Sequence, residues 1–425
     1  MMMRKIGQSF QVTLTLVLAM LILASSSIPP ADPGDALRRY TQMVAFDYVS
    51  WTANALIVKL GQAALTAPRY LTIEEQHGVV KDYLVLVQDT DEAEYQIEKI
   101  YADPKISDKA AALQPWQDKQ QELRKRRAVL GPVAEEVIQK EISEVLAGFG
   151  LAVGGQPMPP VLYHVTPLPY ALIISPRNVI REDNNISLDP DLTLDQMVAL
   201  EKSVEYSLDV STLVTPIGGI GIYPTMVMST DNLPWMLETV AHEWTHNYLT
   251  LRPLGFNYFT TPALRTMNET TANMVGKEVG NELLRRYFPE YLPKPTPTAA
   301  PTPPGGKPTL APTTGPPQFS FNKEMRMTRV QVDALLKEAK IGEAEVYMEE
   351  RRQVFWDHGY LIRRLNQAYF AFNGAYADTP GGGAAGEDPV GPAVLALREK
   401  SKSLADFLNR IAWMTSFEEL QRAIQ

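Results

Sequence analysis

The first third of the chain repeats apolar residues at helical spacing. Asp35 can cap a segment whose apolar face extends to Trp51, and Pro132 can open a second segment that ends near Gly148 and Gly150. The apolar positions of these stripes are Leu37, Tyr40, Val44, Tyr48, Trp51, Val133, Val137, Ile142 and Val145. We interpret them as core positions and predict a helical amino-terminal region over residues 35–150.

Residues 151–292 mix strand and helix patterns. Strands are expected at residues 161–174 and 179–188, a helix at 192–208, a glycine-rich extended segment at 213–228, and a further helix at 263–288. Another helix should begin after the capping residues at 229–232, carry Pro234 in its first turn and stop at Pro253. This order predicts a small sheet followed by two helices.

A proline-rich stretch divides this region from the carboxyl-terminal part. Residues 293–317 hold ten prolines among Thr, Ala and Gly, which predicts a solvated linker or insertion over 293–318. Beyond it, residues 319–425 are expected to be helical, with helices at 323–340, 343–372 and 390–413 and a loop at 378–389. The whole chain is therefore predicted to be α+β and predominantly α-helical.

The pentapeptide His242-Glu243-Trp244-Thr245-His246 has the HEXXH pattern and falls on the helix that ends at Pro253. Residues i and i+4 of a helix share one face, so both imidazoles can reach one ion while Glu243 lies beside it. The alternative is that both histidines are ordinary helix residues. The rest of this helix is largely apolar, and polar groups on such a helix need partners, which favours a metal site.

A carboxylate on the next helix extends this pattern. Asn268-Glu269-Thr270-Thr271-Ala272 lies in its first turns, and the positions that share a face with Glu269 are Ala272, Gly276 and Gly280. These small residues allow close approach to another helix. Glu278 is the nearest rival carboxylate, about half a turn out of phase with Glu269. An exposed first-turn carboxylate is the alternative reading of Glu269.

Residues 215–290, with this HEXXH pentapeptide and downstream glutamate, resemble the gluzincins, zinc peptidases such as thermolysin and the zinc aminopeptidases. The resemblance implies a zincin-like catalytic core in which His242, His246 and Glu269 hold one Zn2+ ion per chain. Glu243 would accept a proton from the attacking water and pass it to the leaving amine. An iron oxygenase triad also uses two histidines and one carboxylate, but the glutamate between the histidines is a hydrolase feature.

The resemblance also gives a role to the glycine-rich segment at 213–228, because in the family an edge strand there pairs with the substrate backbone. A loop with no substrate role is the alternative. Two departures stand out. The gap between His246 and Glu269 is longer than in the best-known gluzincins, and the segment lacks the acid with which zinc aminopeptidases hold a free amino terminus.

Gluzincins stabilise the oxyanion with a tyrosine or histidine. The candidates in this chain are Tyr248, Tyr258, His358, Tyr369 and Tyr376. We select His358, which lies in Phe355-Trp356-Asp357-His358-Gly359-Tyr360, as a catalytic residue. A histidine packed among aromatic rings is the alternative. The helical carboxyl-terminal part is expected to close one wall of the cleft, as in several gluzincins, or else to form an independent module.

Charge and the amino terminus bear on partners and location. The chain has 425 residues and a net charge of −9, which argues against nucleic acid as a partner. Arg4 and Lys5 precede an uncharged run from Ile6 to Ala31, whose apolar centre is Val12 to Ala24. Residues 1–31 are therefore predicted to be a signal peptide or a membrane anchor, and the protein to be extracytoplasmic. It has no cysteine, so neither disulfides nor a lipid-modified cysteine can contribute.

These observations predict an exported or membrane-tethered zinc metallopeptidase that acts on peptide or protein substrates. A non-catalytic metal-binding helical scaffold, or a binding protein at the cell surface, is the alternative. Glu243 distinguishes the two, because a site that only binds metal does not need a carboxylate between its histidines.

Overall fold

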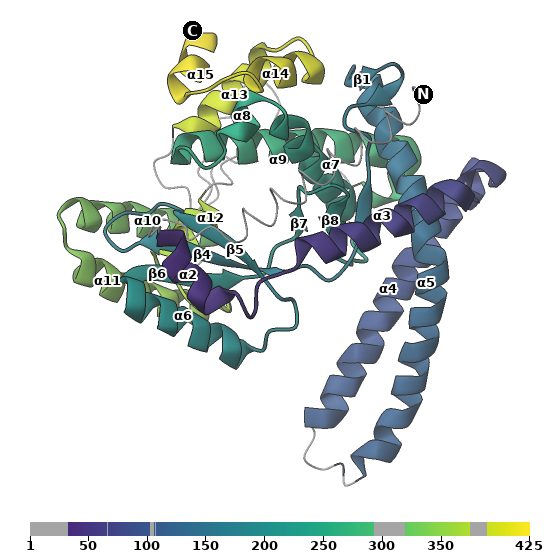
Figure 1. Ribbon diagram of the computed structural model, residues 1–425, viewed down its shortest axis with the longest axis horizontal. Coiled ribbons are helices and arrows are strands. Elements are labelled where there is room, and N and C mark those ends of the chain that lie inside the picture. Colours follow the sequence, from purple (N-terminus) through teal and green to yellow (C-terminus); the bar gives the residue numbers. More distant parts are fainter. Residues whose placement is uncertain (1–32, 66, 103–105, 107, 293–318, 375–388) are drawn as a thin grey trace, which may run out of the picture. The chain divides into compact units, whose positions relative to one another are not determined.

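The computed structural model describes residues 33–65, 67–102, 106, 108–292, 319–374 and 389–425 (Figure 1). The chain divides into two compact units, residues 1–45 and 46–425. In the first unit the described part forms α2 (Pro33–Thr41). The leader or anchor predicted at 1–31 lies outside the described residues, as does the proline-rich stretch at 293–318.

The second unit begins with helices, as predicted. They are α3 (Tyr48–Leu65), η1 (Ala67–Tyr70), α4 (Ile73–Ala102) and α5 (Lys109–Gly148). The prediction of one segment from Asp35 to Trp51 is wrong, because α2 ends at Thr41 and Asp47 opens α3. Its carboxylate accepts hydrogen bonds from the backbone N–H groups of Val49 and Ser50.

Helices α4 and α5 lie side by side as a long hairpin (Figure 1). The prediction that Pro132 opens a helix is wrong, since α5 begins after its cap Asp108 and continues through both Pro115 and Pro132. In the part of α5 that follows Pro132, side chains such as Val137 and Ile142 are buried. Tertiary packing therefore keeps the helix continuous where the local signal predicted a boundary.

Two small sheets follow α5. The first has the order β3-β8-β7, with β3 parallel to β8 and β7 antiparallel to it, and the second has the antiparallel order β5-β4-β6. Their strands are β3 (Tyr163–Val165), β4 (Tyr170–Pro176), β5 (Asn184–Leu188), β6 (Val210–Thr215), β7 (Gly219–Ile220) and β8 (Thr225–Val227). A short hairpin of β1 (Ala152–Val153) and β2 (Gln156–Pro157) precedes them. The glycine-rich segment thus contributes an edge strand, β7, as expected.

The helices predicted around the sheets are present. They are α6 (Leu194–Leu208), α7 (Leu233–Thr250), α8 (Pro253–Phe256), α9 (Pro262–Tyr287) and η2 (Pro289–Tyr291). Asn232 caps α7 through a hydrogen bond from the N–H of Trp235, and Pro234 occupies the first turn. Helix α9 begins after its cap Thr261. The capping signal at residues 229–232 therefore positioned α7 correctly, and α9 agrees with the helix predicted at 263–288.

The segment after residue 318 is helical, but its helices are shorter than predicted. They are α10 (Phe321–Lys337), α11 (Ile341–Asp357), α12 (Gln367–Asn373), α13 (Val390–Lys400), α14 (Leu404–Ile411) and α15 (Phe417–Ala423). The helix predicted at 343–372 breaks at Gly359, whose φ of +86° is outside the helical range, and resumes after the cap Asn366. The one predicted at 390–413 breaks where Ser403 caps α14.

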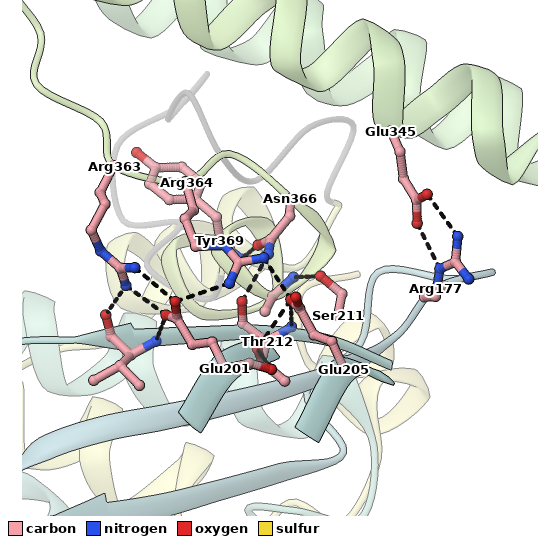
Figure 2. A network of polar contacts seen from close by, with 12 residues as sticks. Arg177, Glu201, Glu205, Ser211, Thr212, Glu345, Arg363, Arg364, Asn366 and Tyr369 are labelled. Carbon is pink, nitrogen blue, oxygen red and sulfur yellow. Dashed lines mark hydrogen bonds and ion pairs between the residues drawn. The ribbon is translucent and has the colours of Figure 1, made fainter. Parts of the chain in front are cut away.

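This carboxyl-terminal segment belongs to the same compact unit as the two sheets and packs against other elements of that unit. Helix α12 contacts β4 and β6, while α13 contacts α9. Figure 2 shows the polar contacts that fix it to the second sheet. The carboxylate of Glu201, in α6, is fully buried and accepts hydrogen bonds from Arg363, Arg364 and the N–H of Val214, at distances between 2.5 and 2.9 Å. Both guanidinium groups, which follow the proline-rich stretch in the sequence, therefore compensate the buried negative charge of Glu201.

The fold of the described residues is α+β and predominantly helical. Its largest apolar core lies beneath α7 and α9 and includes Val240, Trp244, Met267, Val275 and Phe407. Among the helices that the structure describes, none combines the length and the apolar character needed to span a bilayer. Helices α7 and α9, which carry the HEXXH pentapeptide and Glu269, both contribute buried residues to this core.

Candidate metal centre

The two histidines of the pentapeptide point to a common position. His242 and His246 lie one turn apart on α7, with their Nε2 atoms 3.0 Å from each other and their rings at 78°. Both side chains are mostly buried, with 13% and 16% exposed. A helix that carries two imidazoles at this spacing offers two nitrogen ligands to one ion.

The third group comes from the neighbouring helix. Oε2 of Glu269, on α9, lies 3.6 Å from the Nε2 atom of both His242 and His246, and the three ligand atoms are all within 4.8 Å of one another. Glu269 is 4% exposed, so it is not an exposed first-turn carboxylate. Its Oε2 is buried and has no hydrogen-bond partner among the described residues, and the donor set of two imidazoles and one carboxylate suits zinc. These residues therefore fit a metal ion.

Close packing of α7 on α9 brings the ligands together. A Cβ on Gly276 would lie 2.7 Å from the carbonyl oxygen of Glu238, and one on Gly280 would lie 2.8 Å from Cγ of the same residue. The small-residue face predicted for α9 does permit this close approach. Glu278, the rival carboxylate, points to a different helix and pairs with Arg398 at 2.7 and 2.8 Å.

Asn268 holds the second histidine in place. Its Oδ1 lies 2.8 Å from Nδ1 of His246, and its own Nδ2 donates to the carbonyl of Leu254 at 3.3 Å. We infer that Nδ1 of His246 carries the proton, which leaves the Nε2 lone pair directed at the common position. Sequence reasoning missed this role, for which the only signal was that Asn268 directly precedes Glu269.

Burial and charge act together on the titratable groups. Burial lowers the pKa of His246, but the adjacent Glu269 carboxylate outweighs it and raises that pKa to about 9. Burial in turn raises the pKa of Glu269, yet His246 and His242 hold it well below its usual range. Burial also raises the pKa of Glu243, partly opposed by both histidines. Without an ion, the charge of His246 thus compensates the buried carboxylate, and a bound cation would displace its Nε2 proton and take over that role.

Glu243 lies under the glycine-rich edge strand. A Cβ on Gly219 would lie 2.6 Å from Oε1 of Glu243, and one on Gly221 would lie 2.7 Å from Cβ of His246. Asn247 ties the segment that follows this strand to α7, because its Nδ2 donates to the carbonyl of Ile222 at 3.1 Å. The glycines are therefore required for β7 to approach α7 this closely.

A cavity of about 340 Å³ opens beside His242 and Glu243. Its wall includes Ile217, Trp235 and Phe372. Phe372 lies in α12 and so belongs to the carboxyl-terminal segment. The wall also includes the polar side chains of Glu238 and Lys277. A space of this size, with apolar and polar groups in its wall, can accommodate a side chain of a bound molecule.

The oxyanion candidates separate clearly. His358 is exposed, stacks on Phe319 with ring centroids 3.9 Å apart, and has Nδ1 2.8 Å from the carbonyl of Val354. These contacts lie in the helical cluster of α10 and α11. The structure therefore gives His358 no contact with His242, His246 or Glu269, the three residues that we call the His–Glu group. A histidine packed on an aromatic ring, the alternative reading of the sequence, describes what is observed.

The tyrosines differ in the same way. Tyr248 donates from its hydroxyl to Oδ1 of Asn409 at 2.9 Å, and Tyr376 lies outside the described residues. Burial raises the pKa of Tyr369 to about 12. Tyr258, in the loop before α9, donates a hydrogen bond to Oε1 of Glu269. Among the candidate tyrosines that the structure describes, only Tyr258 contacts a residue of the His–Glu group.

Comparisons with known proteins add no further assignment. No family model matches the sequence, and neither the curated proteins nor the solved structures contain a match.

Proposed function

We propose that this protein is a zinc-dependent peptidase of gluzincin type with a zincin-like catalytic region at residues 151–292, acting on peptides or proteins outside the cytoplasm. The convergence of His242, His246 and Glu269 within 4.8 Å carries the proposal. The position of Glu243 between the two histidines favours hydrolysis over metal binding alone.

The three ligands would hold zinc, which would act as a Lewis acid toward the scissile carbonyl and the attacking water. Glu243 accepts the proton of that water through its carboxylate and delivers it to the leaving amine. His246 keeps its Nε2 lone pair available because Asn268 engages Nδ1.

The edge strand β7 supports a peptide as the substrate. It lies at the open side of the order β3-β8-β7 and passes over Glu243, so an extended chain could pair with its free edge next to the general base. The cavity of about 340 Å³ beside Glu243 would take one substrate side chain. His358 is not carried into this proposal because its ring contacts Phe319 and Val354 instead.

The test compares the wild type with Glu243→Gln and Glu269→Gln, and uses Glu278→Gln as the control on the same helix. Wild type and Glu278→Gln should bind one zinc and cleave a peptide mixture in a chelator-sensitive manner. Glu243→Gln should keep zinc and lose about 10²- to 10⁴-fold in kcat, whereas Glu269→Gln should lose zinc. Zinc binding without cleavage by any variant would support the binding-protein alternative instead.

A further inference from the structure

A buried arginine lies behind the candidate metal centre. Arg265, in the first turn of α9, donates from Nε to the hydroxyl oxygen of Tyr258 at 3.3 Å. The Tyr258 hydroxyl in turn donates to Oε1 of Glu269. The guanidinium is thus two hydrogen bonds away from the carboxylate whose other oxygen faces the histidines.

The same guanidinium contacts two other segments. Its Nη2 lies 2.9 Å from Oε2 of Glu182, which shortly precedes β5, and its Nη1 donates to the carbonyl of Ala371, in α12, at 2.8 Å. The side chains of Arg265 and Glu182 are 7% and 2% exposed. A buried pair of this kind is costly to break and holds its members in one geometry.

These contacts divide the two oxygens of Glu269 between different tasks. Oε1 is engaged by Tyr258, whereas Oε2 lies 3.6 Å from the Nε2 atoms of His242 and His246. Hydrogen bonds to a ligating carboxylate fix its orientation and so affect metal affinity. The hydrogen bond from Tyr258 to Oε1 therefore leaves Oε2 as the oxygen that faces both histidines.

We propose that Arg265 is a positioning residue that holds Tyr258 against Glu269, so that zinc affinity depends on the docking of α12 and of the segment before β5. The inference rests on the proposed metal centre. It connects residues on both sides of the proline-rich stretch to a single carboxylate, although neither Glu182 nor Ala371 belongs to the His–Glu group.

The experiment measures zinc affinity by chelator competition for the full chain, with the intensity of the Co2+ absorption bands as a second readout. The variants are Tyr258→Phe, Arg265→Met and the double variant, with Arg265→Lys as the conservative replacement. Arg329→Met is the matched control, because Arg329 also reaches an α12 carbonyl, that of Phe370 at 3.4 Å, and pairs with an acid on its own helix.

Tyr258→Phe and Arg265→Met should each weaken zinc binding about 10- to 100-fold and alter the Co2+ bands, since a freed Oε1 can also approach the ion. Arg265→Lys should restore part of the affinity. The double variant should lose no more than the larger single loss, because both residues act through one hydrogen bond. Arg329→Met should bind zinc within about threefold of wild type.

Two outcomes refute the inference. The first is a Tyr258→Phe variant, which removes one oxygen and leaves the packing intact, that keeps wild-type affinity and Co2+ bands. The second is a double variant in which the two losses add. Tyr258→Phe also decides the matter if Arg265→Met does not fold. If the wild type itself binds neither zinc nor Co2+, the proposed function fails as well, so the two failures are distinguishable.

Discussion

Substitution of Gly276 by alanine tests whether the spacing of α7 and α9 sets the geometry of the ligands. The added Cβ would lie 2.7 Å from the carbonyl oxygen of Glu238 and 3.2 Å from Cβ of His242. Because the first neighbour is backbone, no side-chain rotation can relieve the contact. Ordinary van der Waals contact begins near 3.4 Å, so the helices must move apart by roughly 0.7 Å at this point.

The expected cost follows from two opposing effects. Overpacking of a close contact costs about 1 to 3 kcal/mol, while alanine in place of glycine inside a helix recovers about 0.5 to 1 kcal/mol. The net loss in the free energy of unfolding should be about 0 to 2.5 kcal/mol. His242 and Glu269 lie on opposite helices, and metal–ligand distances tolerate about 0.2 Å, so zinc affinity should fall about tenfold or more.

Urea denaturation of the metal-free protein and chelator competition for zinc measure the two effects separately. The matched control is Gly78→Ala in α4, where an added Cβ meets nothing within 4 Å, and this variant should gain about 0.5 to 1 kcal/mol with unchanged zinc affinity. The reasoning is refuted if Gly276→Ala is as stable as Gly78→Ala, or if it binds zinc as tightly as the wild type.

Three further predictions concern charge and metal. Burial raises the pKa of Glu141 to about 8 from its ordinary 4.5. The folded state therefore holds this proton more tightly, and stability is lost as pH rises from 4.5 to 8, by up to about 1.4 kcal/mol per pH unit. Glu141→Gln should flatten this slope in urea titrations, and parallel slopes would contradict the assignment. Glu201→Gln should cost about 3 kcal/mol, because its carboxylate is buried with two arginines, whereas Glu345→Gln, in a more exposed pair, should cost about 0 to 1 kcal/mol; equal losses by calorimetry would refute this. Zinc at 100 times its Kd should stabilise the wild type by about 2.7 kcal/mol and leave Glu269→Gln unchanged, and a similar shift in both melting curves would exclude Glu269 as a ligand.

The parts of the fold that depend on local signals were predictable from the sequence. The helix predicted at 192–208 is observed as Leu194–Leu208, and the one predicted at 263–288 as Pro262–Tyr287. The residues that define these helices, a cap directly before each one and the apolar spacing within it, are close together in the sequence. The approach of α9 to α7 at Gly276 was also foreseen, because small residues at helical spacing leave room for a neighbour.

Features that depend on distant residues were not predictable in the same way. The sequence around Pro132 resembles a helix start, and only the packing of the buried positions beyond it keeps α5 continuous. The contacts of Arg265 with Glu182 and Ala371 join positions 83 and 106 residues away, which no local pattern connects. His358 was selected by residue type alone, and residue type says nothing about which elements meet in space.

The dependence of Glu201 on Arg364, 163 residues later in the chain, has a consequence for biosynthesis. At the usual pace of translation, roughly 10 to 30 seconds separate the appearance of the acid from that of its partners. During this interval the β5-β4-β6 sheet also lacks α12, so the face formed by Ala171, Ile173 and Leu213 stays uncovered. A product that stops at residue 292 would retain every candidate metal ligand. It would also expose the apolar face of this sheet and leave the Glu201 carboxylate without its arginine partners, so it should aggregate rather than form a shorter active protein.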